Sequence, residues 1–155
     1  MKKNTFPASL VIVPILVALF ILIGWFPKHN NISSDGGIEF ETKGWQQALS
    51  NAKKEKKFVF LDAYTSWCGP CKLLKRTTFK DKNVSSFFNE NFINITMDME
   101  KGEGITLAKK YKVQAFPTLL IIDSEENVIA SVIGYLPPDQ LIDFGKHALI
   151  EGKMK

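Results

Sequence analysis

The hydrophobic residues of this 155-residue chain are not spread evenly. Residues 8–26, with the sequence ASLVIVPILVALFILIGWF, form a largely apolar run without a charged side chain. Its length is close to the roughly 20 apolar residues that a helix needs to cross a bilayer. Lys2 and Lys3 precede the run, and lysines mark the cytoplasmic side of a membrane helix. We therefore predict a cytoplasmic N-terminus (1–7) and a transmembrane signal-anchor (8–26), with the rest of the chain outside the cytoplasmic membrane.

Two other interpretations of this apolar run remain open. A cleaved signal peptide usually has an apolar core of about 7–15 residues and then small residues at the cleavage site. This run is longer and ends in Gly24-Trp25-Phe26-Pro27. A helix in the core of a globular domain would have a polar face, and the run has none. The pattern therefore favours an uncleaved anchor over both.

A polar stretch follows the apolar run. Residues 27–37, PKHNNISSDGG, are rich in asparagine, serine and glycine, a composition typical of a flexible linker. We therefore predict one further domain over residues 38–155, which is long enough to bury a hydrophobic core of its own.

Within this domain the hydrophobic pattern alternates between the period of helices and that of strands. The helical pattern predicts helices over 44–55, 68–79, 81–90, 104–113 and 137–151. Short apolar runs predict strands over 57–64, 92–99, 118–123 and 128–133, the last two joined by a tight hairpin at SEEN. This order predicts an α/β domain with a central mixed sheet, in which helical crossovers join parallel strands before an antiparallel hairpin. Helices should cover both faces of the sheet.

Two local signals refine the predicted helices. Asp81 or Asn83 can serve as the N-cap of the helix over 81–90, because both side chains accept hydrogen bonds from free backbone N–H groups. Gly145 lies inside the last helix, where glycine weakens helix formation by roughly 1 kcal/mol relative to alanine.

Composition and charge exclude several classes of function. The chain is 45% hydrophobic and 23% charged, and its net charge of +4 comes from scattered lysines rather than one cluster. A dispersed excess of this kind is typical of a solvated surface and does not predict nucleic-acid binding. The only histidines, His29 and His147, are far in sequence from the only two cysteines, so a structural zinc site lacks ligands. We predict no metal and no cofactor.

The two cysteines, Cys68 and Cys71, stand where a strand and loop meet a predicted helix. Free N–H groups and the helix dipole stabilise a thiolate at such a position, which makes Cys68 the candidate nucleophile. Pro70 fits the first helical turn, where no N–H is needed. Cys71 lies one turn further along the same face and can resolve a mixed disulfide formed at Cys68. An inert disulfide is the alternative, but a two-residue loop constrains the unfolded chain little.

Three stretches of the chain resemble the thioredoxin family. WCGPCK (67–72) is similar to the active-site motif of that family, and Asp62 stands six residues before the first cysteine, where thioredoxins keep a buried acid. AFPT (115–118) matches the segment that carries the family's cis-proline. The resemblance covers roughly residues 38–150. RTTFKDKNVSSFF (76–88) resembles a narrower group, the C-terminal domain of bacterial transmembrane thiol-disulfide interchange proteins.

The resemblance implies a thioredoxin fold and a set of site residues. It implies a redox-active Cys68–Cys71 disulfide and a proton-transfer role for Asp62 in deprotonating Cys71, which suits a desolvated carboxyl of raised pKa. It implies substrate binding by Trp67, Gly69, Pro70, Phe116 and Pro117. In thioredoxins a lysine on the next strand partners the buried acid, and the nearest position in this chain is identified as Asn94.

These observations predict an extracytoplasmic thiol-disulfide oxidoreductase in a bacterial membrane, acting on protein disulfides. The Gly-Pro dipeptide between the cysteines is that of the strongly reducing thioredoxins, which favours a reductase. Because the space outside the membrane is oxidising, a reductase there needs a membrane electron donor. An oxidase or isomerase of the same fold and a non-catalytic peptide-binding or holdase module remain alternatives. Copper handling is disfavoured, because no histidine or methionine lies beside the pair.

Overall fold

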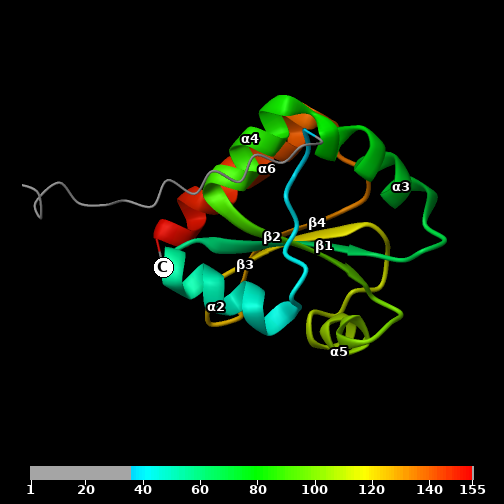
Figure 1. Ribbon diagram of the computed structural model, residues 1–155, viewed down its shortest axis with the longest axis horizontal. Helices are drawn as coiled ribbons and strands as arrows, with labels where there is room; N and C mark the ends of the chain where they lie inside the picture. Colours follow the sequence, from blue (N-terminus) through cyan, green and yellow to red (C-terminus); the bar gives the residue numbers. More distant parts are fainter. Residues whose placement is uncertain (1–35, 155) are drawn as a thin grey trace, which may run out of the picture. The chain divides into compact units, whose positions relative to one another are not determined.

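The computed structural model describes residues 36–154, a mixed sheet covered by helices (Figure 1). The elements are, in chain order, α2 (Trp45–Glu55), β1 (Phe58–Tyr64), α3 (Gly69–Arg76), the 3₁₀ helix η1 (Thr78–Lys80), α4 (Lys82–Asn91), β2 (Phe92–Asp98), α5 (Glu103–Lys110), β3 (Thr118–Ile122), β4 (Val128–Ile133) and α6 (Pro138–Lys153). The predicted signal-anchor, the residues before it and most of the linker lie outside the described residues. Over 36–154, no helix combines the length and apolar character needed to span a bilayer.

The four strands pair in the order β2-β1-β3-β4. β1 and β2 are parallel, as the helical connection between them predicted. β3 runs antiparallel to β1, so the expectation that the helix over 104–113 crosses between parallel strands is wrong. β1 and β2 end at the same edge of the sheet, where Asp98 pairs with Tyr64, and the connection through α5 leads the chain into β3 at that edge. β3 therefore starts beside the end of β1, where Thr118 pairs with Ala63.

Each face of the sheet carries its own hydrophobic core. Alternate residues of β1 point to opposite faces: Phe60 packs with residues of α3, α4 and α6, whereas Val59 and Leu61 pack with residues of α2 and α5. Figure 1 shows α4 and α6 on one side of the sheet and α2 and α5 on the other. By the same alternation, Asp62 lies on the face of Phe60, toward the helix that carries the cysteines.

The predicted helix over 68–79 is divided in the structure. α3 ends at Arg76, and η1 follows it after Thr77. The Thr77 hydroxyl donates to the carbonyl oxygen of Leu73, and the Thr78 hydroxyl donates to that of Leu136. Such side-chain bonds compete with regular helix geometry. The next helix has Asp81 as its N-cap, with its carboxylate accepting from the backbone N–H groups of Asn83 and Val84.

Gly145 allows a close approach between α6 and α4. A Cβ atom at this position would lie 2.7 Å from a ring carbon of Phe87 and 3.2 Å from one of Phe88. Glycine weakens the helix here but lets α6 pack closely on these two aromatic rings. The sequence of the helix alone does not indicate this close packing.

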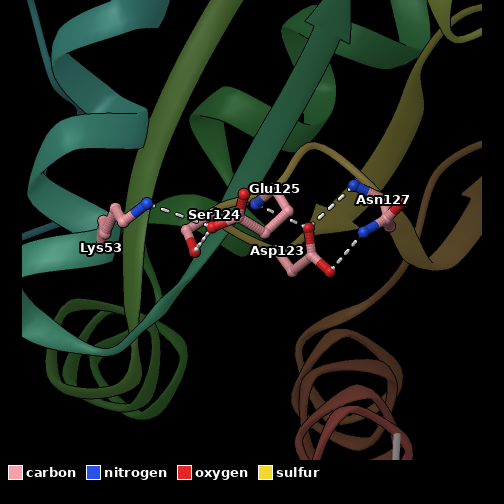
Figure 2. Close-up of polar contacts among 5 residues, drawn as sticks. All are labelled: Lys53, Asp123, Ser124, Glu125 and Asn127. Atoms are coloured by element: carbon pink, nitrogen blue, oxygen red, sulfur yellow. Dashed lines mark hydrogen bonds and ion pairs between the residues drawn. The ribbon is translucent and has the colours of Figure 1, made fainter.

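A polar turn joins β3 to β4 at the predicted hairpin. The Asp123 carboxylate accepts hydrogen bonds from the backbone N–H groups of Glu125 (2.9 Å) and Asn127 (2.8 Å) and from the Asn127 side chain (2.9 Å) (Figure 2). The exposed Lys53–Glu125 ion pair beside the turn measures 3.3 Å and contributes little to stability. The Asp123 side chain therefore fixes the conformation of this turn.

Replacing Asp123 with alanine should lower the free energy of unfolding by about 1–2 kcal/mol, because three hydrogen bonds of the turn are lost. Urea unfolding of the full-length chain measures this change. The control is Ser124→Ala in the same turn, which should change stability by less than about 0.5 kcal/mol. Equal effects of the two substitutions would contradict the role of the Asp123 carboxylate.

Candidate active site

The two cysteines form a disulfide at the start of α3. Cys68 is the N-cap of this helix, and its Sγ accepts a hydrogen bond from the backbone N–H of Cys71 at 3.1 Å. Both cysteines are buried, whereas Gly69 and Pro70 between them are exposed. In the reduced state the same free N–H groups and the helix dipole would stabilise a thiolate at Cys68. The local geometry is therefore that of a reactive thiol at a helix N-terminus.

Trp67 presents an exposed aromatic surface beside the disulfide. The side chain is 65% exposed, so it is not a core aromatic residue. Its indole Nε1 donates to both carboxylate oxygens of Glu100, at 3.0 and 3.1 Å, and its ring meets that of Phe116 edge to face at 5.9 Å. The fold thus brings together two of the predicted substrate-binding residues. The contact of Trp67 with Glu100 was not predicted, because the residues around Glu100 carry no signal for it.

The segment that follows α5 places Pro117 at the start of β3. The Phe116–Pro117 peptide bond is cis, the isomer that the resemblance implies. The carbonyl oxygen of Pro117 accepts from the N–H of Gly134 at 2.8 Å, which ties this segment to the end of β4. The part that Phe116 and Pro117 play in substrate binding stays a prediction.

Asp62 is a fully buried carboxyl group in the central strand. Its Oδ2 accepts a hydrogen bond from the Thr96 hydroxyl at 2.8 Å and lies 4.0 Å from Nζ of Lys75. Its Oδ1 has no hydrogen-bond partner within residues 36–154. Burial raises the pKa of Asp62 to about 6, although the Thr96 hydrogen bond and the Lys75 charge act to lower it. A carboxyl group with such a pKa can exchange protons near neutral pH.

The residue expected opposite Asp62 on the next strand, Asn94, lies two positions before the one that the structure places there. β1 and β2 begin in register, so Asp62 pairs with Thr96 and Phe60 pairs with Asn94. The Asn94 amide instead donates to the carbonyl oxygen of Glu39 and to the side chain of Asn89.

The cation near Asp62 comes from α3, not from the next strand. Sequence reasoning missed Lys75, although its place four residues after Cys71 puts both side chains on one face of the helix. That spacing was the signal by which it could have been found.

A mixed sheet between helices, with a cysteine pair opening the helix after the central strand and a cis-proline before β3, is the thioredoxin fold. The resemblance predicted this fold, and the structure confirms it. The chain belongs to the thioredoxin-like domain family, whose model matches residues 45–149.

Several relatives carry names from disulfide chemistry. The thiol:disulfide interchange protein DsbD of Yersinia pestis is 34% identical over 94 residues, which cover 59% of this chain and 16% of that protein. The chain therefore spans a small part of the length of the DsbD proteins that it matches. These names and the Cys68–Cys71 pair support a disulfide oxidoreductase.

Two solved structures share the fold. A candidate disulphide-isomerase from Bacteroides thetaiotaomicron is 43% identical, with a TM-score of 0.66, and the match covers 76% of this chain and 97% of that one. The oxidised C-terminal domain of Neisseria meningitidis DsbD is 24% identical, with a TM-score of 0.58 and coverage of 72% and 98%. At that lower identity, the likeness shows the fold alone.

The raised pKa of Asp62 predicts a dependence of stability on pH. Between the usual aspartate pKa of 3.8 and about 6, the folded state binds a proton that the unfolded state releases. The free energy of unfolding contributed by Asp62 is therefore highest below pH 3.8 and falls as the pH rises through this window. Asp62→Asn should stabilise the oxidised chain at pH 7 by up to about 3 kcal/mol and should have little effect near pH 4.

Urea unfolding between pH 4 and pH 8 measures this difference. The matched control is Asp143→Asn, since Asp143 is an exposed aspartate on α6, and this substitution makes the same chemical change away from the buried site. A constant effect of Asp62→Asn from pH 4 to pH 8 would show that the pKa of Asp62 is not raised.

Proposed function

We propose that this chain is a membrane-anchored thiol-disulfide oxidoreductase that reduces protein disulfides outside the cytoplasm. The observation that carries the proposal is the Cys68–Cys71 disulfide at the N-cap of α3. A disulfide with only two residues between its cysteines constrains the unfolded chain little, whereas a thiol at a helix N-terminus is suited to attack. The buried Asp62 and the exposed Trp67 supply the neighbouring acid and a surface for a client.

The proposed reaction begins with both cysteines reduced. The Cys68 thiolate attacks one sulfur of a client disulfide, forms a mixed disulfide and releases the other client sulfur as a thiolate. Asp62 accepts the proton of Cys71, and the Cys71 thiolate attacks Sγ of Cys68. The bond between Cys68 and the client breaks, the second client sulfur leaves as a thiolate, and the Cys68–Cys71 disulfide forms. The client gains two electrons, which a donor dithiol must then return to the chain.

We also propose the direction of electron transfer and the side of the membrane on which the domain lies. The Gly-Pro dipeptide between the cysteines supports reduction, by likeness to thioredoxin, and the interchange name of the Yersinia pestis relative fits transfer of electrons between dithiols. The apolar run over 8–26, preceded by two lysines, supports a single-pass anchor with the domain on the extracytoplasmic side. A reductase there needs a membrane electron donor, which we infer from the oxidising surroundings.

Isomerisation is the second candidate function. It is favoured by one observation, the 43% identity to a Bacteroides thetaiotaomicron structure described as a candidate disulphide-isomerase. The two functions differ in redox poise, because isomerases hold their disulfide at a higher potential than thioredoxins do.

The reduction potential of the Cys68–Cys71 pair should lie near the thioredoxin value of about −270 mV. Equilibration of the full-length chain with glutathione or dithiothreitol buffers at pH 7 measures it. A potential near about −180 mV would favour the isomerase, and a value near about −120 mV would contradict a reductase and indicate an oxidase.

The Cys71→Ser substitution should trap clients, because no resolving thiol remains to release the mixed disulfide at Cys68. The full-length variant is expressed in bacterial cells, and mass spectrometry of the adducts identifies the trapped proteins. Adducts to secreted or membrane-exposed proteins are expected, and adducts to cytoplasmic proteins alone would contradict the proposed location. The control, Cys68→Ser, should give no adducts and no activity, whereas a holdase module would keep its activity in that variant.

A further inference from the structure

A pocket lies beside the buried carboxyl group of Asp62. It has a volume of about 330 Å³ and is bounded by the segment 37–40, by α3 and η1, and by β2. Thr96 and Lys75 both line it. These are the two side chains that contact Oδ2 of Asp62, at 2.8 and 4.0 Å. Both of these polar contacts of the Asp62 carboxyl group are therefore with side chains that line the pocket.

Lys75 contacts the buried acid and is itself partly exposed to solvent. Asp62 has no exposed surface, whereas about a third of the Lys75 side chain is exposed. The Lys75 ammonium lies over the ring of Tyr64, 3.2 Å from its centroid. A cation held on an aromatic face has fewer positions open to it, so the ring of Tyr64 fixes the ammonium near Asp62. Tyr64 and Asp62 belong to the same strand and the same face of the sheet.

We propose that Lys75 is a positioning residue for proton transfer at Asp62: held by Tyr64, it favours the ionised carboxylate and so sets the pH above which Asp62 accepts the proton of Cys71. This inference rests on the proposed function, in which Cys71 must lose a proton. In this step the proton of Cys71 moves to Asp62 and then passes through the pocket to water. The Cys71 sulfur meanwhile displaces the client from Cys68.

Three other charged residues lie near Lys75 or line the pocket. Asp98, at the end of β2, acts on Lys75 rather than on the acid. Glu39 and Lys80 line the same pocket. Burial lowers the pKa of Lys75, while the carboxylates of Asp62 and Asp98 raise it. Of the charged side chains described around the acid, Lys75 is the one that acts on the pKa of Asp62, lowering it against the effect of burial.

The test is a titration of the Asp62 carboxyl carbon by NMR, in the oxidised full-length chain in detergent micelles. Lys75→Met keeps most of the length of the side chain and removes its charge, so the titration midpoint of Asp62 should rise by about one pH unit. Lys75→Arg should restore the midpoint toward that of the unchanged chain. Tyr64→Leu should move it in the same direction as Lys75→Met but by less, because the ammonium is then held less firmly.

Arg76→Met is the matched control. It removes one positive charge from the same helix at an exposed position, and the midpoint should not move. An unchanged midpoint in Lys75→Met, or an equal rise in Arg76→Met, would overturn the proposal. If Lys75→Met does not fold, Lys75→Gln provides the same comparison.

The titration requires no client and no catalysis, so it can fail while the proposed function stands. Conversely, the midpoint can shift as expected in a chain that reduces no disulfide. The pH profile of disulfide reduction gives a second measurement. Its acid limb should move upward by the same amount in Lys75→Met, and a profile that keeps its position while activity falls uniformly would indicate only structural damage.

Discussion

The burial of one carboxyl group constrains much of this structure. Asp62 lies in the central strand with no exposed surface, and an unpaired charge in such a place is costly. The neighbouring elements compensate this cost only in part. β2 supplies the hydroxyl of Thr96 and α3 supplies the ammonium of Lys75. One carboxyl oxygen of Asp62 has no hydrogen-bond partner among the described residues. The acid therefore keeps a raised pKa, and the fold retains a group that is poised to exchange a proton.

The helix that holds the cysteines connects this acid to the surface. Its first residues set the chemistry of Cys68, and its second turn carries Lys75 to the acid. On the outer side, Trp67 is held by Glu100 and packs against Phe116. The disulfide at the start of α3 and the contact of Lys75 with the buried acid are thus connected through one short helix, so a small displacement of α3 would affect both.

Much of the fold could be predicted from the sequence, because local patterns determine it. The period of the hydrophobic residues predicted the order of helices and strands, the turn chemistry predicted the hairpin, and the nearly continuous apolar run FVFLDAY predicted a strand. The position of Cys68 before Pro70 predicted the start of α3. Each of these depends on residues close together in the chain, where propensity and capping act.

What the sequence by itself determined is therefore the order of the elements, the helix start at Cys68 and the acid upstream of it. The tertiary structure alone decided the direction of β3, the pairing of Asp62 with Thr96 rather than Asn94, and the contacts of Trp67 with Glu100 and Phe116. Strand register and direction depend on how separate segments pack, and a shift of two residues keeps every side chain on its face of the sheet. The hydrophobic pattern is the same in both registers, so only the packed sheet could distinguish them.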